Sequence, residues 1–89
     1  MEYRIIKVVS LERKIPTGKT KHFEGGIELP AATMLQITQY PGDSGFYLFY
    51  LNGQGEVMTD TYHTTIEGAF EQASWEYNVD PAEWIDQTD

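Results

Sequence analysis

One run of six apolar residues, FYLFYL at positions 46–51, constrains the fold of this chain more than any other feature. A strand that is apolar on both sides is typical of a central position in a sheet, where both of its faces are covered. Turn-forming residues bound the run, with PGDSG at 41–45 before it and NGQG at 52–55 after it. Because short turns of this kind connect antiparallel strands, the run predicts a central strand between two hairpin partners.

The segments around this strand supply its partners and one long connection. Residues 33–40 alternate between apolar and polar side chains, residues 56–62 form the returning strand, and the β-branched stretch 3–9 predicts a further strand. Residues 12–30 contain two prolines and three glycines and therefore predict a loop. A loop of this length is unusual in a compact domain, so it is either functional or contains a short strand near 21–24.

The C-terminal third predicts one amphipathic helix. Thr64 and Glu67 have the spacing of a capping box, in which each side chain satisfies an orphan backbone N–H group. Asn78 suits the left-handed C-cap of this helix, and Asp80 followed by proline predicts a second, very short helix. The apolar residues that recur at helical spacing are Ile66, Ala69, Phe70, Ala73 and Tyr77.

These elements predict an α+β fold in one domain, residues 1–89. We expect an antiparallel sheet of three to four strands with one amphipathic C-terminal helix packed on one face. Pairing Leu51 with Glu56 and Tyr40 with Phe46 sets the register, and the register sets the two faces of the sheet. The face expected to pack on the helix carries Leu35, Ile37, Tyr47, Phe49 and Leu51. The opposite face is expected to carry Tyr40, Phe46, Leu48 and Tyr50.

Two surfaces are candidates for binding a partner: this second sheet face and the polar side of the helix. The candidate residues are Tyr40, Phe46, Leu48, Tyr50, Glu67, Glu71 and Trp75. The sheet face is either a protein–protein or homodimer surface, or it is covered by the 12–30 segment. On the helix, Trp75 is either a binding anchor or, as we favour, covered by the C-terminal tail with Trp84.

The charge of the chain is divided between its two parts. All six Lys and Arg residues lie in the first 21 positions, whereas twelve of the fourteen acids lie after them. A head of about +4 is thus joined to a body of about −12, for a net charge of −8. Such a body is repelled by anionic lipid and by phosphate, so we expect no membrane partner and rank nucleic-acid contact, through the basic residues 13–22, behind a protein partner. The open alternatives are a basic protein partner, self-association, or docking of the basic 12–30 segment on the chain's own acidic body.

The chemistry-bearing residues do not predict catalysis. Without cysteine the chain forms no disulfide and no thiolate metal site, which favours a cytoplasmic protein. GDSG at 42–45 matches the nucleophile peptide of chymotrypsin-like proteases, but that fold needs two barrels, so here the tetrapeptide predicts a turn. We therefore assign no catalytic residue, no cofactor and no metal. The alternative is a small enzyme or ligand-binding domain, which requires Asp60, Tyr62 and His63 to converge between sheet and helix.

About half of the chain resembles a group of small proteins. The stretches 45–51, 52–55, 59–63 and 73–84 are similar to small uncharacterised acidic bacterial proteins of strand–strand–strand–helix type. Some immunity proteins of bacterial toxin systems have a similar size and acidity. By analogy, the resemblance implies an acidic body that occupies a basic groove of its target. Together with the charge distribution, it favours a non-enzymatic interaction protein with a basic partner.

Overall fold

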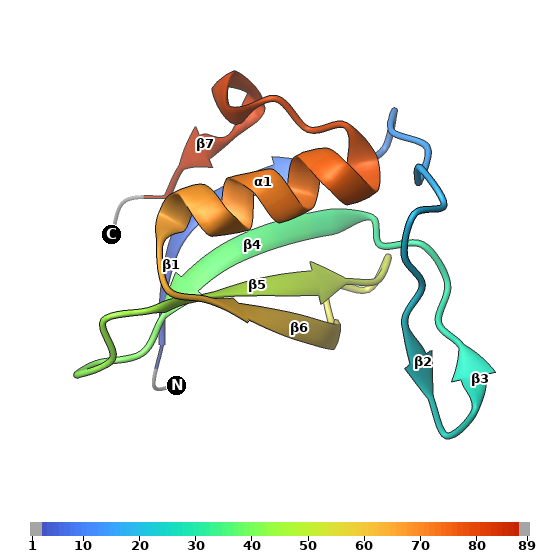
Figure 1. The fold of residues 1–89 in the computed structure, drawn as a ribbon, viewed down its shortest axis with the longest axis horizontal. Coiled ribbons are helices and arrows are strands. Elements are labelled where there is room, and N and C mark those ends of the chain that lie inside the picture. Colours follow the sequence, from blue (N-terminus) through green and yellow to red (C-terminus); the bar gives the residue numbers. More distant parts are fainter. Residues whose placement is uncertain (1–2, 88–89) are drawn as a thin grey trace.

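The computed structural model describes residues 3–87, in which a five-stranded antiparallel sheet carries one α-helix across one face (Figure 1). The sheet has the order β6-β5-β4-β1-β7. Its strands are β1 (Arg4–Ser10), β4 (Met34–Gln39), β5 (Phe46–Leu51), β6 (Val57–His63) and β7 (Ile85–Asp86). The other elements are the hairpin β2 (Phe23–Glu24) and β3 (Ile27–Glu28), the helix α1 (Ile66–Tyr77) and the 3₁₀ helix η1 (Pro81–Glu83). The predicted α+β class is confirmed, with β5 in the sheet interior as expected.

Capping residues fix both ends of α1. Thr65 is the N-cap, and its side chain accepts a hydrogen bond from the backbone N–H of Gly68 at 3.1 Å. The prediction that Thr64 caps the helix was therefore wrong by one residue. Asn78 adopts the left-handed conformation at the C-cap, with φ of 57°, as predicted. Asp80 caps η1 through a capping box with Glu83. Within residues 3–87, no helix has the length and apolar character needed to cross a membrane.

The register of β4 on β5 differs by one residue from the predicted register, and Leu51 pairs with Val57 of β6 rather than with the predicted Glu56. Leu35 pairs with Tyr50 and Ile37 pairs with Leu48. Tyr40 belongs to the turn rather than to the strand, because its carbonyl accepts a hydrogen bond from Asp43 N at 3.1 Å. A slip of one residue moves the whole apolar set of a strand to the other face relative to its partner. The face that packs on α1 therefore carries Leu48 and Tyr50, and the prediction that they lie on an uncovered face was wrong.

The core lies between this face and α1. Its buried members include Leu35, Ile37, Leu48 and Tyr50 of the sheet and Ala69, Ala73 and Tyr77 of the helix. Trp84 closes one end of the core and packs on Phe70, with ring centroids 5.8 Å apart. Trp75 remains 44% exposed. The expectation that the C-terminal tail covers Trp75 was therefore wrong, because Trp84 is buried against the apolar stripe of the helix instead.

The basic 12–30 segment docks at the C-terminal end of α1. Thr17 donates from its backbone N to Glu76 O at 2.8 Å and from Oγ1 to Trp75 O at 2.6 Å. Lys14 Nζ lies 2.9 Å from Glu83 Oε2 and donates to Asn78 O at 3.0 Å. A cation at this position also meets the negative end of the helix dipole. Of the alternatives for the basic 12–30 segment, the structure shows docking on the chain's own acidic body, at least through Lys14. The short strand expected near 21–24 is β2.

Candidate functional site

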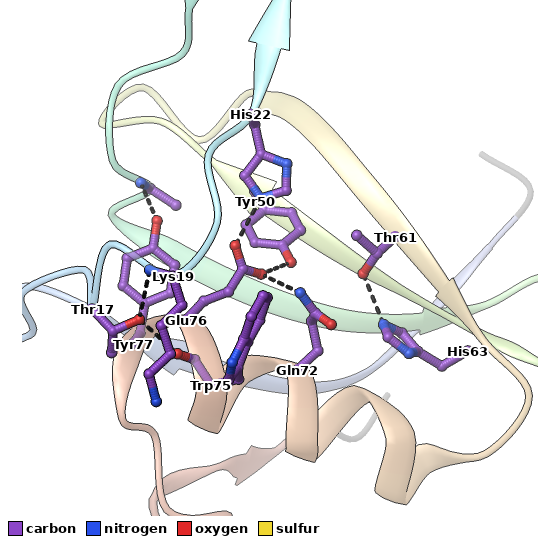
Figure 2. Close-up of polar contacts among 11 residues, drawn as sticks. Thr17, Lys19, His22, Tyr50, Thr61, His63, Gln72, Trp75, Glu76 and Tyr77 are labelled. Carbon is purple, nitrogen blue, oxygen red and sulfur yellow. Dashed lines mark hydrogen bonds and ion pairs between the residues drawn. The ribbon is translucent and has the colours of Figure 1, made fainter.

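The buried carboxylate of Glu76 joins three parts of the chain. Glu76 lies in the last turn of α1 and is only 4% exposed. Its Oε1 accepts hydrogen bonds from the Tyr50 hydroxyl and, at 2.9 Å, from Gln72 Nε2. Its Oε2 lies 2.8 Å from Nε2 of His22 in the docked segment (Figure 2). The ring of His22 also packs on that of Tyr50, with centroids 4.6 Å apart.

Glu76, Tyr50, Gln72 and His22 form a cluster, the Glu76 cluster, that attaches the 12–30 segment to the rest of the fold. Three donors surround the carboxylate, as a buried charge requires. Tyr50 is 1% exposed, so its hydroxyl donates to Glu76 and is not accessible to a ligand from solution. A cavity of about 110 Å³ borders His22 and Glu76 beneath the segment, and it has room for several water molecules. We interpret the cluster as the point at which the 12–30 segment is fastened to helix and sheet.

Sequence reasoning missed this cluster, although one signal was present. Glu76 follows Ala69 by seven residues and Ala73 by three, so it occupies the apolar stripe of α1 rather than the polar side. A lone charge in such a stripe predicts a buried partner. The partners themselves carry no local pattern, because His22 and Tyr50 are 54 and 26 residues away in the sequence.

Burial and Glu76 together control the ionisation of two tyrosines. Burial raises the pKa of Tyr50 far above its ordinary value of 10.0, and the hydrogen bond to Glu76 raises this pKa further. Burial also raises the pKa of Tyr77, whose hydroxyl accepts a hydrogen bond from Ala32 N at 3.0 Å. Both phenols therefore keep their protons in the folded chain at a pH at which the unfolded chain loses them.

We expect the free energy of unfolding to decrease as the pH rises above about 10. The unfolded chain releases the protons of Tyr50 and Tyr77 there while the folded chain retains them. Their contribution to stability is therefore complete below about pH 10 and declines progressively as the pH rises toward their higher pKa values in the folded chain. Urea unfolding at a series of alkaline pH values measures the decline. The decline should be shallower in Tyr50→Phe, and an identical slope in this variant would contradict the role of Tyr50.

The sheet face opposite α1 carries a continuous group of aromatic rings, which we call the aromatic face. Its members are Tyr3, Tyr40, Tyr47, Phe49 and Tyr62. The ring centroids of Tyr47 and Tyr62 lie 5.0 Å apart, and those of Tyr40 and Tyr47 lie 5.3 Å apart. Phe49 is buried, whereas the four tyrosines are partly or largely exposed. Asp60 projects onto the same face, because it pairs with Phe49 across β5 and β6.

The turn before β5 holds Tyr62 at the edge of the aromatic face. The Tyr62 hydroxyl donates to Asp43 Oδ1 at 3.2 Å, and Asp43 Oδ1 also accepts from Gly45 N at 2.9 Å. The Tyr62 ring covers Gly45 so closely that a Cβ there would lie 1.9 Å from the hydroxyl oxygen. Tyr62 keeps this position only because residue 45 is a glycine. The GDSG tetrapeptide therefore has a structural role in this fold.

An open groove lies between the end of β6 and the outer side of α1, and we call it the β6 groove. It has a volume of about 440 Å³ and is lined by His63, Gly68, Glu71, Gln72 and Trp75. Gly68 leaves space beside His63, since a Cβ there would lie in ordinary contact, 3.4 Å from the Cβ of His63. His63 Nε2 lies 2.8 Å from Thr61 Oγ1. Burial lowers the pKa of His63, which favours the neutral ring.

The four partner-binding residues predicted on the sheet lie on two different faces in the structure. Leu48 and Tyr50 are buried beneath α1, so the prediction that they form a binding surface was wrong. The cause is the register, which turns both side chains toward the helix. Phe46 is partly buried against the same core and pairs with His63, so the prediction that it lies on the face opposite α1 was also wrong. Tyr40 lies on the aromatic face and contacts Tyr47, and its role in binding stays a prediction.

The predicted helix residues lie on the surface but not in one place. Glu71 and Trp75 line the β6 groove together. Glu67 is exposed in the first turn of α1. A partner that fills the groove would therefore contact Glu71 and Trp75 directly. The role of these two residues and of Glu67 in binding stays a prediction.

The alternative site of Asp60, Tyr62 and His63 does not assemble. Asp60 and Tyr62 project onto the aromatic face, where Tyr62 contacts Tyr47. His63 projects to the α1 side, because adjacent strand residues point to opposite faces, and there it lines the β6 groove. The three side chains therefore do not converge on one substrate.

In comparisons with known proteins, the chain matches no family model, no curated protein and no solved structure. Within residues 3–87, no group of three or more His, Asp or Glu side chains is placed to hold a metal ion. The candidate site is therefore defined by the geometry of the chain itself, as the aromatic face and the β6 groove on the two sides of β6.

Proposed function

We propose that this protein is a non-enzymatic interaction module that binds a basic partner protein. The observation that carries the proposal is the aromatic face, with its partly exposed tyrosines beside the carboxylate of Asp60. All its members except Tyr3 come from the part of the chain that contains no Lys or Arg. Tyrosine is enriched at protein–protein interfaces, because it combines a large apolar area with a polar end.

Such a face suits cationic side chains in two ways. The ring face of a tyrosine attracts an ammonium or guanidinium group by about 0.5–1 kcal/mol at an exposed site. The net charge of −8 adds a long-range attraction that raises the association rate. Part of the chain's own positive charge is already paired, because Lys7, Lys14 and Lys21 form ion pairs with Asp86, Glu83 and Glu28.

The proposal includes the bacterial cytoplasm as the place of action. The absence of cysteine supports a reducing compartment, since small secreted domains usually rely on disulfides. The resemblance to small acidic bacterial proteins supports the bacterial origin. We therefore expect the partner to be a basic protein of the bacterial cytoplasm.

Affinity purification from a bacterial lysate, followed by kinetics with each purified candidate, tests the proposed function. We expect the association rate to fall at least about tenfold between low and high salt, because salt screens the attraction. Tyr47→Ala should accelerate dissociation, because it removes the ring that contacts both Tyr40 and Tyr62. Ile85→Ala, at an exposed residue of β7, is the matched control and should leave both rates unchanged. An association rate that ignores salt would contradict the proposal.

A further inference from the structure

The two edges of the sheet are unequal. One edge is β7, which has two residues, and the other is β6, which has seven. An edge strand directs every second pair of backbone N–H and C=O groups away from the sheet. Among residues 3–87, the backbone hydrogen bonds of β6 are made with β5. The outer side of β6 therefore presents a row of free donors and acceptors.

From Thr59 to His63, Asp60 is the one feature of β6 that commonly protects an edge strand. The strand's sequence, VMTDTYH, contains neither Lys nor Pro, which commonly block the addition of a further strand. Its register shift lies at its start, opposite the step from Tyr50 to Leu51. From Thr59 to His63 the pairing with β5 is regular. This part of the edge can accept another strand without rearrangement.

β6 also borders both candidate surfaces. Tyr62 and Asp60 project onto the aromatic face, whereas His63 projects into the β6 groove beside Gly68 and Trp75. A strand paired with β6 would place its alternate side chains on these two sides of the sheet.

We propose that β6 accepts an extended basic segment of the partner protein as an additional strand of the sheet. This inference rests on the proposed function and adds the place and the mode of binding. Side chains on the aromatic side of the added strand meet Asp60 and Tyr62, which favours Lys or Arg. Side chains on the α1 side meet the β6 groove, where exposed Trp75 and the space at Gly68 favour a large apolar residue.

The charge of the edge decides between a basic partner and a second copy of this chain. A second copy presents the same acidic edge, with Asp60 on one side of β6 and Glu71 in the groove on the other side. Repulsion between two edges of the same charge disfavours the pairing of β6 with itself. The chain's own basic residues are poorly placed to form the strand that pairs with β6. β1 lies inside the sheet, and the 12–30 segment is fastened to α1 through Lys14 and His22. A separate basic protein is therefore the occupant that the edge fits.

Selection of a displayed random peptide library on the full-length protein tests the proposal even while the partner protein is unidentified. We expect the enriched peptides to alternate Lys or Arg with large apolar residues. On binding, they should slow hydrogen exchange of the backbone amides in residues 57–63. Asp60→Lys and Trp75→Ala should each weaken a selected peptide at least about tenfold.

Matched controls separate these effects from changes of net charge or folding. Glu24→Lys makes the same charge change as Asp60→Lys at an exposed residue of β2, and Ile85→Ala truncates an exposed apolar residue of β7. Both controls should leave the peptide affinity within about twofold of wild type. Gly68→Ala should narrow the groove and weaken the peptide while the unfolding temperature does not fall, because alanine is the better helix former.

Three outcomes would overturn the proposal. Basic peptides that bind without slowing hydrogen exchange in residues 57–63, and whose affinity falls in Tyr47→Ala, would overturn strand addition and leave the proposed function standing. Failure to enrich basic peptides over acidic ones would overturn both. Concentration-dependent protection of residues 57–63 without peptide would show that a second copy is the occupant.

Discussion

Glu76→Ala is expected to lower the free energy of unfolding by about 3–5 kcal/mol, the usual cost of breaking a buried charged network by removing one member. The change leaves the Tyr50 hydroxyl, Gln72 Nε2 and His22 Nε2 without their shared acceptor. Small domains have a total stability of about 5–15 kcal/mol, so this loss is a large fraction of the whole. Urea unfolding measured by circular dichroism gives the value.

Two further variants identify the cause of this loss. Glu76→Gln keeps the shape and one acceptor oxygen, so it should cost less than Glu76→Ala. Glu71→Ala removes an exposed carboxylate from the same helix and should change stability by no more than about 0.5 kcal/mol. Equal losses in Glu76→Ala and Glu71→Ala would show that the buried network does not stabilise the fold.

Leu48→Ala is expected to lower the free energy of unfolding by about 2–5 kcal/mol, the range for removing a large aliphatic side chain from a core. Leu48 is 0% exposed, and the change leaves a cavity between β5 and α1. Val57→Ala, at an exposed residue of β6, is the control and should have a much smaller effect. Both values come from the same urea unfolding measurement.

This pair of variants also tests the strand register. With Leu35 opposite Tyr50, Leu48 faces the helix. In the register predicted from the sequence, Leu48 lies on the other face, where its truncation would leave no cavity under α1. A loss of less than about 1 kcal/mol for Leu48→Ala would therefore contradict the observed pairing.

Local sequence signals predicted the elements, because those signals act over a few residues. The turns on either side of residues 46–51 located β5, and Asn78 marked the end of α1. The two residues of β7 were missed, since they form a strand only by pairing with Lys7 and Val8 of β1. The register was missed because it depends on how many residues the turn takes up, and Tyr40 joins the turn through one backbone hydrogen bond.

The candidate site was less predictable than the fold, because its parts come from distant positions. The aromatic face combines residues of different strands with Tyr3 and Tyr40, and a single register error assigns the wrong rings to it. Trp75 was found from the sequence because a large apolar residue on the polar side of a helix is a local anomaly. His22 had no such signal, since its partner lies 54 residues further along the chain.

Trypsin can cut this chain only within its basic N-terminal part, because the protease cleaves after Lys and Arg and none follows residue 21. Lys14 and Thr17 hold the docked segment against the end of α1, so cleavage after Lys14 or Lys19 requires the segment to detach first. The rate of tryptic cleavage there therefore reports the opening of this one segment. The strands β4, β5 and β6 and the helix offer the protease no site, even when they unfold.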